Sequence, residues 1–280
     1  MHRVVLATDR SHAEGYADDH PLIDAFARRG ASARFVPWDA ADFDWSDCSA
    51  VLLRSTWDYP ARHADFLRWV EALPVPLWNP PDLVAWNSRK TYLFDLAAWG
   101  VPIIPTVPLA PSEDLGGALL ALGWDEAVVK PVVGAGGRST WRVNAGNAAV
   151  VNTFLRSLNC AMLLQPFVPE FATSGEWSLI YFGGKLSHTL QKRAAPGEFR
   201  VQEVHGGTIR RVQPTDAMLA VARDVLEAVG EPLPYARVDL VDGPTGPRLV
   251  EAELIEPELF FRLAPGSPDA LVEAVVGRLT

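Results

Sequence analysis

Three carboxylates in the last fifth of the sequence could bind a metal ion. Asp239 lies in the strand-like run 235–241 (YARVDLV), and Glu251 and Glu253 lie in the next run, 249–253 (LVEAE). Successive side chains of a strand point to opposite faces, so the two glutamates share a face. The short turn between the runs predicts a hairpin that brings Asp239 near both. Carboxylates brought together repel one another unless a hard cation such as Mg²⁺ lies between them. The alternative is a pair of exposed strands with solvated acids.

A glycine-rich stretch, residues 127–143 (AVVKPVVGAGGRSTWRV), could cover a phosphate group. Gly134, Gly136 and Gly137 lie between two strand-like runs, and Lys130 precedes them. Glycines let backbone N–H groups approach an anion closely, and a lysine adds a point charge. A Walker A loop and a dinucleotide fingerprint both need a strand-to-helix context, which is absent here. The stretch is therefore either a hinged flap over a phosphate or a plain hairpin turn with a solvated tip.

Two further segments could contact a nucleotide. Asn87 and Ser88 are expected to cap a helix that runs to Trp99, with Lys90 in its first turn. A bound anion would offset the unfavourable placement of a lysine at the positive end of a helix, whereas a surface lysine is the alternative. Residues 165–170 (QPFVPE) are stiffened by two prolines and predict an extended connector outside any helix. The main chain of such a connector could bind an adenine edge, or it could serve as a hinge between lobes.

The first 86 residues alternate between strand and helix patterns. Strands are expected at 3–8, 33–37 and 50–53, and helices at 21–29 and 64–73, which predicts a small, mostly parallel sheet. Ligands gather at the carboxyl ends of strands in such sheets. The cluster RSTWDY after the third strand, with Arg54 and Trp57, is therefore a candidate substrate contact. Its alternative is a loop anchored by two aromatic residues.

Composition limits the class of protein. A net charge of −9 over 280 residues argues against nucleic acid as a partner. Two cysteines are too few for a disulfide framework, and we expect a reducing cytoplasm as the location. No apolar run reaches membrane-spanning length, and residues 1–10 are predicted to form a strand and a turn, not a signal peptide.

The order of these motifs resembles that of the ATP-grasp ligases over about residues 87–280. Within that superfamily the chain is most similar to the glutathione synthetase and ribosomal-protein glutamate ligase group, through the segment KRAAPGEFRVQEVHGG. The stretches RSTWDY, WNSRKTYLFDL and ELIEPELFF look closest to the subgroup that includes a D-cycloserine-forming cyclo-ligase.

The resemblance implies an α/β chain with α+β lobes. An N-terminal α/β substrate-side domain would span residues 1–86, a central lobe with the glycine flap 87–165, and a C-terminal lobe with the metal site 166–280. It also implies ATP, Mg²⁺ that Mn²⁺ could replace, a small amino-acid-like substrate and a homo-oligomer, with neither nucleic acid nor membrane as partner.

The same resemblance implies a set of site residues. ATP would be bound by Lys90, Lys130, Gly134, Gly136, Gly137, Arg138, Ser139, Gln165, Phe167, Val168, Glu170 and Glu176. Mg²⁺ would be bound by Asp239, Glu251 and Glu253, and the substrate by Arg54, Trp57 and Gln202. Arg193, Arg200 and Arg237 would stabilise the transferring phosphoryl group.

The implied reaction is ATP-dependent formation of an amide from a carboxylate and an amine through an acyl phosphate. It would occur within one molecule, as in a cyclo-ligase of antibiotic biosynthesis, or between two, as in an amino-acid or dipeptide ligase. A non-catalytic ATP-binding protein is a third alternative. Two positions depart from the glutathione synthetase pattern: Glu253 stands where asparagine is common, and Ser178 where a basic residue is common. The second departure argues against a glutathione precursor as the substrate.

Overall fold

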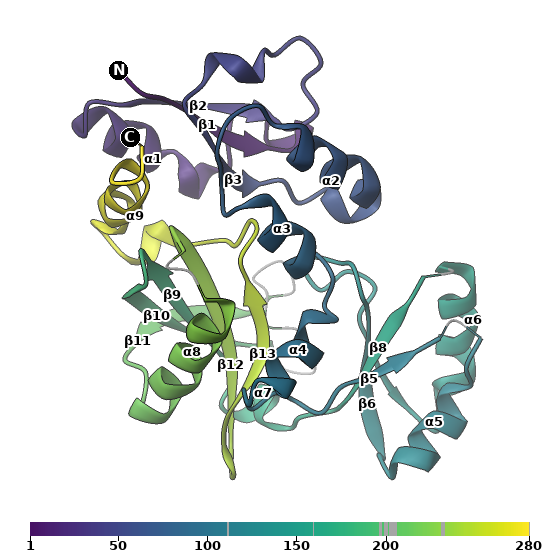
Figure 1. The fold of residues 1–280 in the computed structure, drawn as a ribbon. Coiled ribbons are helices and arrows are strands. Elements are labelled where there is room, and N and C mark those ends of the chain that lie inside the picture. The colour runs from purple at the N-terminus through teal and green to yellow at the C-terminus, as the bar shows by residue number, and fades with distance from the viewer. Residues whose placement is uncertain are drawn as a thin grey trace.

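The computed structural model describes residues 1–110, 112–158, 160–195, 198, 201, 206–230 and 233–279. Within these residues the chain forms three β-sheets with helices packed against them (Figure 1). The predicted α/β fold class is therefore confirmed. No helix in the described ranges is long and apolar enough to cross a membrane.

The first sheet is parallel and has the order β2-β1-β3-β4. Its central strands are buried along almost their whole length, as expected when helices cover a parallel sheet. The predicted strands and helices of this region are all present. The strands are β1 (Arg3–Thr8), β2 (Ser32–Pro37), β3 (Ala50–Ser55) and β4 (Leu77–Trp78), and the helices are α1 (Pro21–Arg28), α2 (His63–Ala72) and α3 (Pro81–Asn87).

The second sheet is antiparallel, with the order β11-β10-β9-β12-β13. Helix α8 packs against β12 and β13, and α9 returns to pack against α1 (Figure 1). The first two sheets share a core in which Leu6 and Leu22 meet Phe182 and Val272. These elements are β9 (Glu176–Phe182), β10 (Lys185–Arg193), β11 (Thr208–Val212), α8 (Asp216–Val229), β12 (Tyr235–Gly243), β13 (Gly246–Glu253) and α9 (Ser267–Val276).

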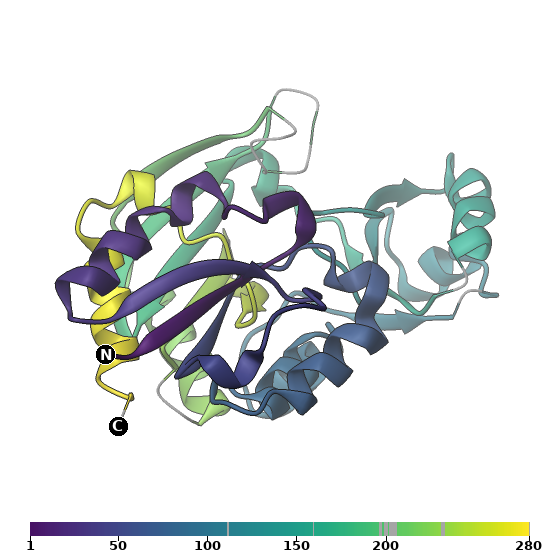
Figure 2. The same cartoon turned by 90° about the horizontal axis from the view of Figure 1, so that it is seen from above.

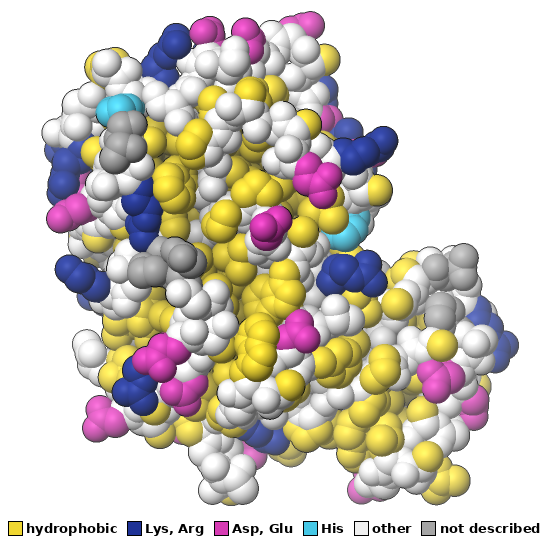
Figure 3. Space-filling view, in the orientation of Figure 1, with side chains coloured by type: hydrophobic (Ala, Val, Ile, Leu, Met, Phe, Trp, Pro, Cys, Tyr) yellow, Lys and Arg dark blue, Asp and Glu magenta, His cyan; other side chains and the backbone are white. Residues whose placement is uncertain are grey.

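The third sheet, with the order β5-β8-β6-β7, projects from the rest of the molecule and has a core of its own (Figure 2). Its helices α5 and α6 leave apolar side chains exposed, including Leu120, Val150 and Phe154, and Figure 3 shows apolar surface over this lobe. The elements are β5 (Val107–Leu109), α5 (Leu115–Leu122), β6 (Glu126–Pro131), β7 (Trp141–Asn144), α6 (Ala148–Leu158) and β8 (Met162–Pro166).

The helix predicted from Asn87 to Trp99 is wrong. Helix α3 ends at Asn87, and α4 (Tyr92–Ala98) begins five residues later. Asn87 caps no helix start, because its buried amide group bonds to strand β13 instead. Its Nδ2 donates to the carbonyl of Ala252 at 2.9 Å, and its Oδ1 accepts from the N–H of Leu254 at 3.0 Å. Lys90 lies between the two helices, where its backbone N–H donates to the carbonyl of Val132.

The connector at 165–170 is only partly extended. The N–H of Phe167 donates to the carbonyl of Glu126 at 2.9 Å, and the carbonyl of Val168 accepts from Phe171 at 3.2 Å. Helix α7 (Glu170–Thr173) then begins, so the prediction of a segment outside any helix is wrong at Glu170. Pro169 precedes this helix, and the fixed φ of proline suits a helix start.

We expect Asn87→Ala to lower the free energy of unfolding by about 1–3 kcal/mol, because two buried backbone groups of β13 lose their partner. Asn87→Asp should also destabilise the protein, since a carboxylate cannot donate to the carbonyl of Ala252. Asn147→Ala is the matched control, because the two hydrogen bonds of that half-exposed side chain can be replaced by water. Urea unfolding checks this, and equal stability of the Asn87→Ala variant and the native protein would contradict it.

Candidate active site

A cavity of about 560 Å³ lies where the three sheets meet. Trp57 follows β3 of the first sheet, Lys130 lies on β6 of the third, and Asp239 lies on β12 of the second; all three line it. The cavity therefore brings together candidate residues from all three parts of the chain.

The glycine stretch forms one wall of this cavity. Gly134, Gly136, Gly137 and Arg138 line it, whereas Ser139 does not. Gly136 and Gly137 have φ values of 63° and 67°, in the left-handed region that favours glycine. A Cβ atom at Gly134 would lie 2.9 Å from Cγ of Pro131. The turn between β6 and β7 thus needs glycine for both conformation and space.

The two predicted phosphate-binding lysines both line the cavity, but their surroundings differ. Lys90 is ion-paired with Glu251, which outweighs the effect of burial and raises the pKa of Lys90. Lys130 is 8% exposed and forms no ion pair with a carboxylate of the described residues. Burial lowers the pKa of Lys130 to about 8. A buried ammonium without a carboxylate partner is suited to bind an anionic ligand.

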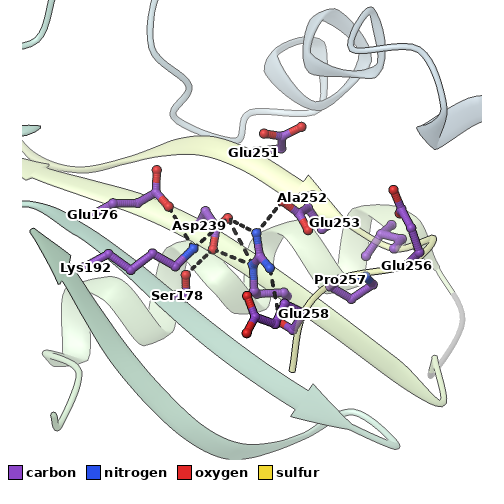
Figure 4. Close-up of polar contacts among 12 residues, drawn as sticks. Glu176, Ser178, Lys192, Asp239, Glu251, Ala252, Glu253, Glu256, Pro257 and Glu258 are labelled. Carbon is purple, nitrogen blue, oxygen red and sulfur yellow. Dashed lines mark hydrogen bonds and ion pairs between the residues drawn. The ribbon is translucent and has the colours of Figure 1, made fainter. Parts of the chain in front are cut away.

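The predicted metal-binding acids are paired with basic side chains: Glu251 with Lys90, and Asp239 and Glu253 within the network of contacts in Figure 4. Asp239 accepts hydrogen bonds from Arg237 Nη2 at 2.9 Å and from Ser178, and its Oδ2 lies 3.7 Å from Lys192 Nζ. Arg237 is also ion-paired with Glu253. No three His, Cys, Asp or Glu side chains converge as a metal cluster in the part of the chain that the structure describes. The described residues therefore contain no preformed metal cluster; each of the three acids is paired with a basic side chain instead.

Burial sets the protonation of these acids. It raises the pKa of Glu253 to about 8, although Arg237 acts in the opposite direction. Burial would also raise the pKa of Asp239, but Arg237 and Lys192 together lower it below its usual value. For Glu176 burial prevails over its ion pair with Lys192 (3.1 Å), and the pKa is raised. Carboxylate oxygens are ligands that a hard divalent cation prefers, so the chemistry of Asp239, Glu251 and Glu253 suits such an ion, although each is paired with a basic side chain in this structure.

The connector supplies part of the cavity wall. Gln165 and Phe167 line it, and the guanidinium of Arg142 lies 3.7 Å from the centre of the Phe167 ring. Val168 and Glu170 are not among the lining residues. Val168 is buried in a small core with Val241, and the Glu170 carboxylate lies close to Gly243.

Aromatic rings close the end of the cavity nearest the first sheet. The Trp57 ring lies 4.9 Å from that of Tyr16 and 5.0 Å from that of His12, and its Nε1 donates to the carbonyl of Glu256 at 3.1 Å. Arg54 does not line the cavity. It is buried, ion-paired with Asp19 at 2.9 Å, and its Nη2 also donates to the carbonyl of Pro257 at 3.0 Å. A direct substrate contact is therefore not open to Arg54 in this structure.

Of the two predicted catalytic arginines that the structure describes, Arg237 lines the cavity and Arg193 does not. Arg193 is exposed at the end of β10, while Arg200 and Gln202 lie outside the described residues. Sequence reasoning did not assign Lys192, which is buried and lines the cavity. Strand periodicity carries the signal: Lys192 shares its strand face with the buried Leu190, whereas Arg193 points the other way.

Comparison with known proteins agrees with this geometry. Residues 120–257 match the ATP-grasp domain of prokaryotic glutathione synthetase, and residues 4–79 match the N-terminal domain of the D-cycloserine synthetase DcsG. The chain belongs to the ATP-grasp ligases of the glutathione synthetase type, enzymes that form C–N bonds and use ATP and divalent metal ions. The resemblance found in the sequence is confirmed.

Within this family, the chain is similar to a cycloserine biosynthesis enzyme. It is 33% identical to the cycloserine biosynthesis protein DcsG of Streptomyces lavendulae, over 99% of this chain and 98% of that protein. A crystal structure of D-cycloserine synthetase DcsG superposes with a TM-score of 0.89 at 32% identity, covering 99% of this chain and 100% of that one. A probable alpha-L-glutamate ligase of Shewanella halifaxensis is 28% identical over 74% of this chain but only 45% of its own length.

We expect the native protein to lose affinity for AMP-PNP and Mg²⁺ as the pH rises from 7 to 9, and the Lys130→Arg variant to lose less. Lys130 has a lowered pKa of about 8, so it is charged below pH 8 and must take up a proton to pair with phosphate above it. Each pH unit above 8 should weaken binding by up to about tenfold until the higher pKa of the complex is reached. Arginine stays protonated throughout.

Calorimetric titrations of the two proteins check this expectation. The comparison isolates Lys130, because Glu253, whose pKa is also about 8, is the same in both. Identical pH dependence in both proteins would show that Lys130 does not hold the phosphate.

We expect backbone amides at residues 134–139 to exchange hydrogen more slowly once AMP-PNP and Mg²⁺ are bound, because a flap that closes over phosphate gains hydrogen bonds. Hydrogen exchange with mass spectrometry measures this, with α8 as the internal control because it lies outside the cavity wall. If the exchange rate at residues 134–139 is the same with and without the nucleotide, the flap hypothesis is wrong and the stretch is a plain hairpin turn.

Proposed function

We propose that this enzyme forms an amide bond within one small amino-acid-like molecule, through an acyl phosphate made at the expense of ATP. The observation that carries the proposal is the similarity to the D-cycloserine synthetase DcsG over 99% of the chain, with the substrate-side domain included. The aromatic end of the cavity, formed by His12, Tyr16 and Trp57, is consistent with a substrate of amino-acid size.

ATP supplies the phosphoryl group that activates the carboxylate, and we propose Mg²⁺, with Mn²⁺ as a substitute, as the divalent ion. Lys130 and Lys90 would hold phosphate oxygens, while Asp239, Glu251 and Glu253 would hold the metal. Lys90 and Glu251 neutralise each other in this structure, so the phosphate and the metal would each replace one partner of that ion pair. Exchange of one charged partner for another keeps both side chains neutralised in a buried site.

Arg237 and Lys192 would keep Asp239 ionised and in place. Arg237 contacts Asp239, Glu253 and the carbonyl of Glu258, so its guanidinium joins the metal side of the cavity to the substrate side. Such fixed charges stabilise a developing negative charge without having to reorganise. The phosphoryl-stabilising role of Arg193 and Arg200 and the substrate contact of Gln202 remain predictions.

An acyl phosphate is lost to hydrolysis if water reaches it. We propose that residues 134–139 close one side of the cavity and that the aromatic end closes the other. Adenine and ribose would lie toward Gln165 and Phe167, next to that flap. Val168 and Glu170 would support the residues that line the cavity without contacting the nucleotide themselves. Arg54 would position the segment at residue 257 through its hydrogen bond to that carbonyl.

We also propose that the segments 1–86, 87–165 and 166–280 act as the substrate-side domain, flap lobe and metal lobe. The packing of α9 against α1 would fix the last segment to the first. The homo-oligomeric state and cytoplasmic location remain predictions.

Release of ADP tests the function. Candidate amino acids are supplied singly and in pairs with ATP and Mg²⁺. Turnover with a single compound supports ring closure, and a strict need for two compounds would instead support an intermolecular ligase. ATP binding without ADP release for any compound would support the non-catalytic alternative.

In the same assay we expect Glu251→Gln and Asp239→Asn to lose at least about 100-fold in turnover, because metal-held phosphate contacts stabilise the transition state. The control is Glu273→Gln, which removes an exposed ion pair with Arg29, the residue after α1, and should leave turnover unchanged. Full activity of Glu251→Gln would exclude the proposed metal site.

A further inference from the structure

The segment after β13, residues 256–259, is held in place by side chains from several elements. Its successive backbone carbonyls accept hydrogen bonds from Trp57 Nε1 (3.1 Å), Arg54 Nη2 (3.0 Å) and Arg237 Nη1 (3.1 Å), and the carbonyl of Leu259 lies 2.9 Å from Nε2 of His188. These side chains come from the first sheet and from β10 and β12 of the second. The segment is therefore fixed before any substrate arrives.

Glu256 projects from this fixed segment into the cavity without a partner from any other residue. It is 8% exposed and lines the cavity; its own backbone N–H donates to the carboxylate, but no other described residue forms a hydrogen bond or an ion pair with it. The other acids that line the cavity are all paired with basic side chains: Glu176 and Asp239 with Lys192, Glu251 with Lys90, Glu253 with Arg237 and Glu258 with Arg262. Glu256 is thus a buried carboxylate that forms no ion pair with the described residues.

The charges around Glu256 do not supply this partner. Burial raises the pKa of Glu256 to about 7; Lys90 and Arg237 lower it, and Glu251 raises it further. The nearby hydroxyls of Tyr59 and Tyr235 have raised pKa values and stay neutral. Glu253 is the remaining acid close by. Because Lys90 and Arg237 already pair with other carboxylates, a cationic ligand would recover the cost of burying this charge.

We propose that Glu256 binds the ammonium group of the amino-acid substrate. This inference rests on the proposed function, since it assigns one end of the same substrate. Glu256 is not one of the three acids proposed for the metal, and the nearest of them, Glu251 and Glu253, are already paired with Lys90 and Arg237. An ammonium is satisfied by one carboxylate together with aromatic faces, and Tyr59 and Trp57 line the cavity alongside Glu256. The substrate class is then one that keeps a charged amine.

Binding of two matched probes tests this without turnover. D-alanine and L-alanine are each compared with propionate, which has the same carboxylate but lacks the amine, by calorimetry on protein saturated with AMP-PNP and Mg²⁺. We expect one alanine enantiomer to bind at least tenfold more tightly than propionate. Glu256→Gln keeps the shape of the side chain but removes its charge, and should reduce this preference to less than threefold with AMP-PNP affinity unchanged. The surface control Glu273→Gln should keep the full preference.

Two results would overturn the proposal: no preference for alanine over propionate in the native protein, or a preference that survives Glu256→Gln. If Glu256→Gln fails to fold, Glu256→Asp provides the test, because a shorter carboxylate should weaken the preference without abolishing it. An unaltered preference in Glu256→Asp would then count against Glu256. None of these measurements needs catalysis, so a failure to release ADP with every amino acid would refute the proposed function alone.

Discussion

The buried charge network around Asp239 is the interaction on which the rest of the structure depends. Asp239 on β12 meets Lys192 from β10 and Ser178 from β9, while Arg237 links it to Glu253 on β13. A buried charge that loses its partner is costly, by about 3–5 kcal/mol, so these four strands must stay in register. That register in turn fixes the positions of the three acids of the proposed metal site.

Much of the architecture could be predicted because its signals are local. Alternation along 235–241 and 249–253 predicted the β12–β13 hairpin, in which Asp239 pairs in register with Glu251. The glycines between two apolar runs predicted the turn between β6 and β7. The strand–helix alternation of the first 86 residues predicted the parallel sheet. In each case the signal comes from residues that are neighbours in the sequence, within one element or in the turn that follows it.

Other features escaped prediction because their partners are distant in the sequence. Asn87 looked like a helix cap, but its amide group bonds to β13, 165 residues away at Ala252. Arg54 follows a strand, as substrate-binding residues often do, yet Asp19 and Pro257 bury its guanidinium. Arg193 was assigned to the site and its neighbour Lys192 was not, yet Lys192 is the one that is buried and lines the cavity.

The return of α9 to α1 ties the last part of the chain to the first. The first and second sheets share one core, which includes residues of that helix. The third sheet has a separate core and carries the glycine turn. If the cavity opens for its ligands, we expect the third sheet to move relative to the other two. Residues 256–259 follow β13 in the larger unit, so we expect the end of the cavity that they form to keep its shape during such a movement.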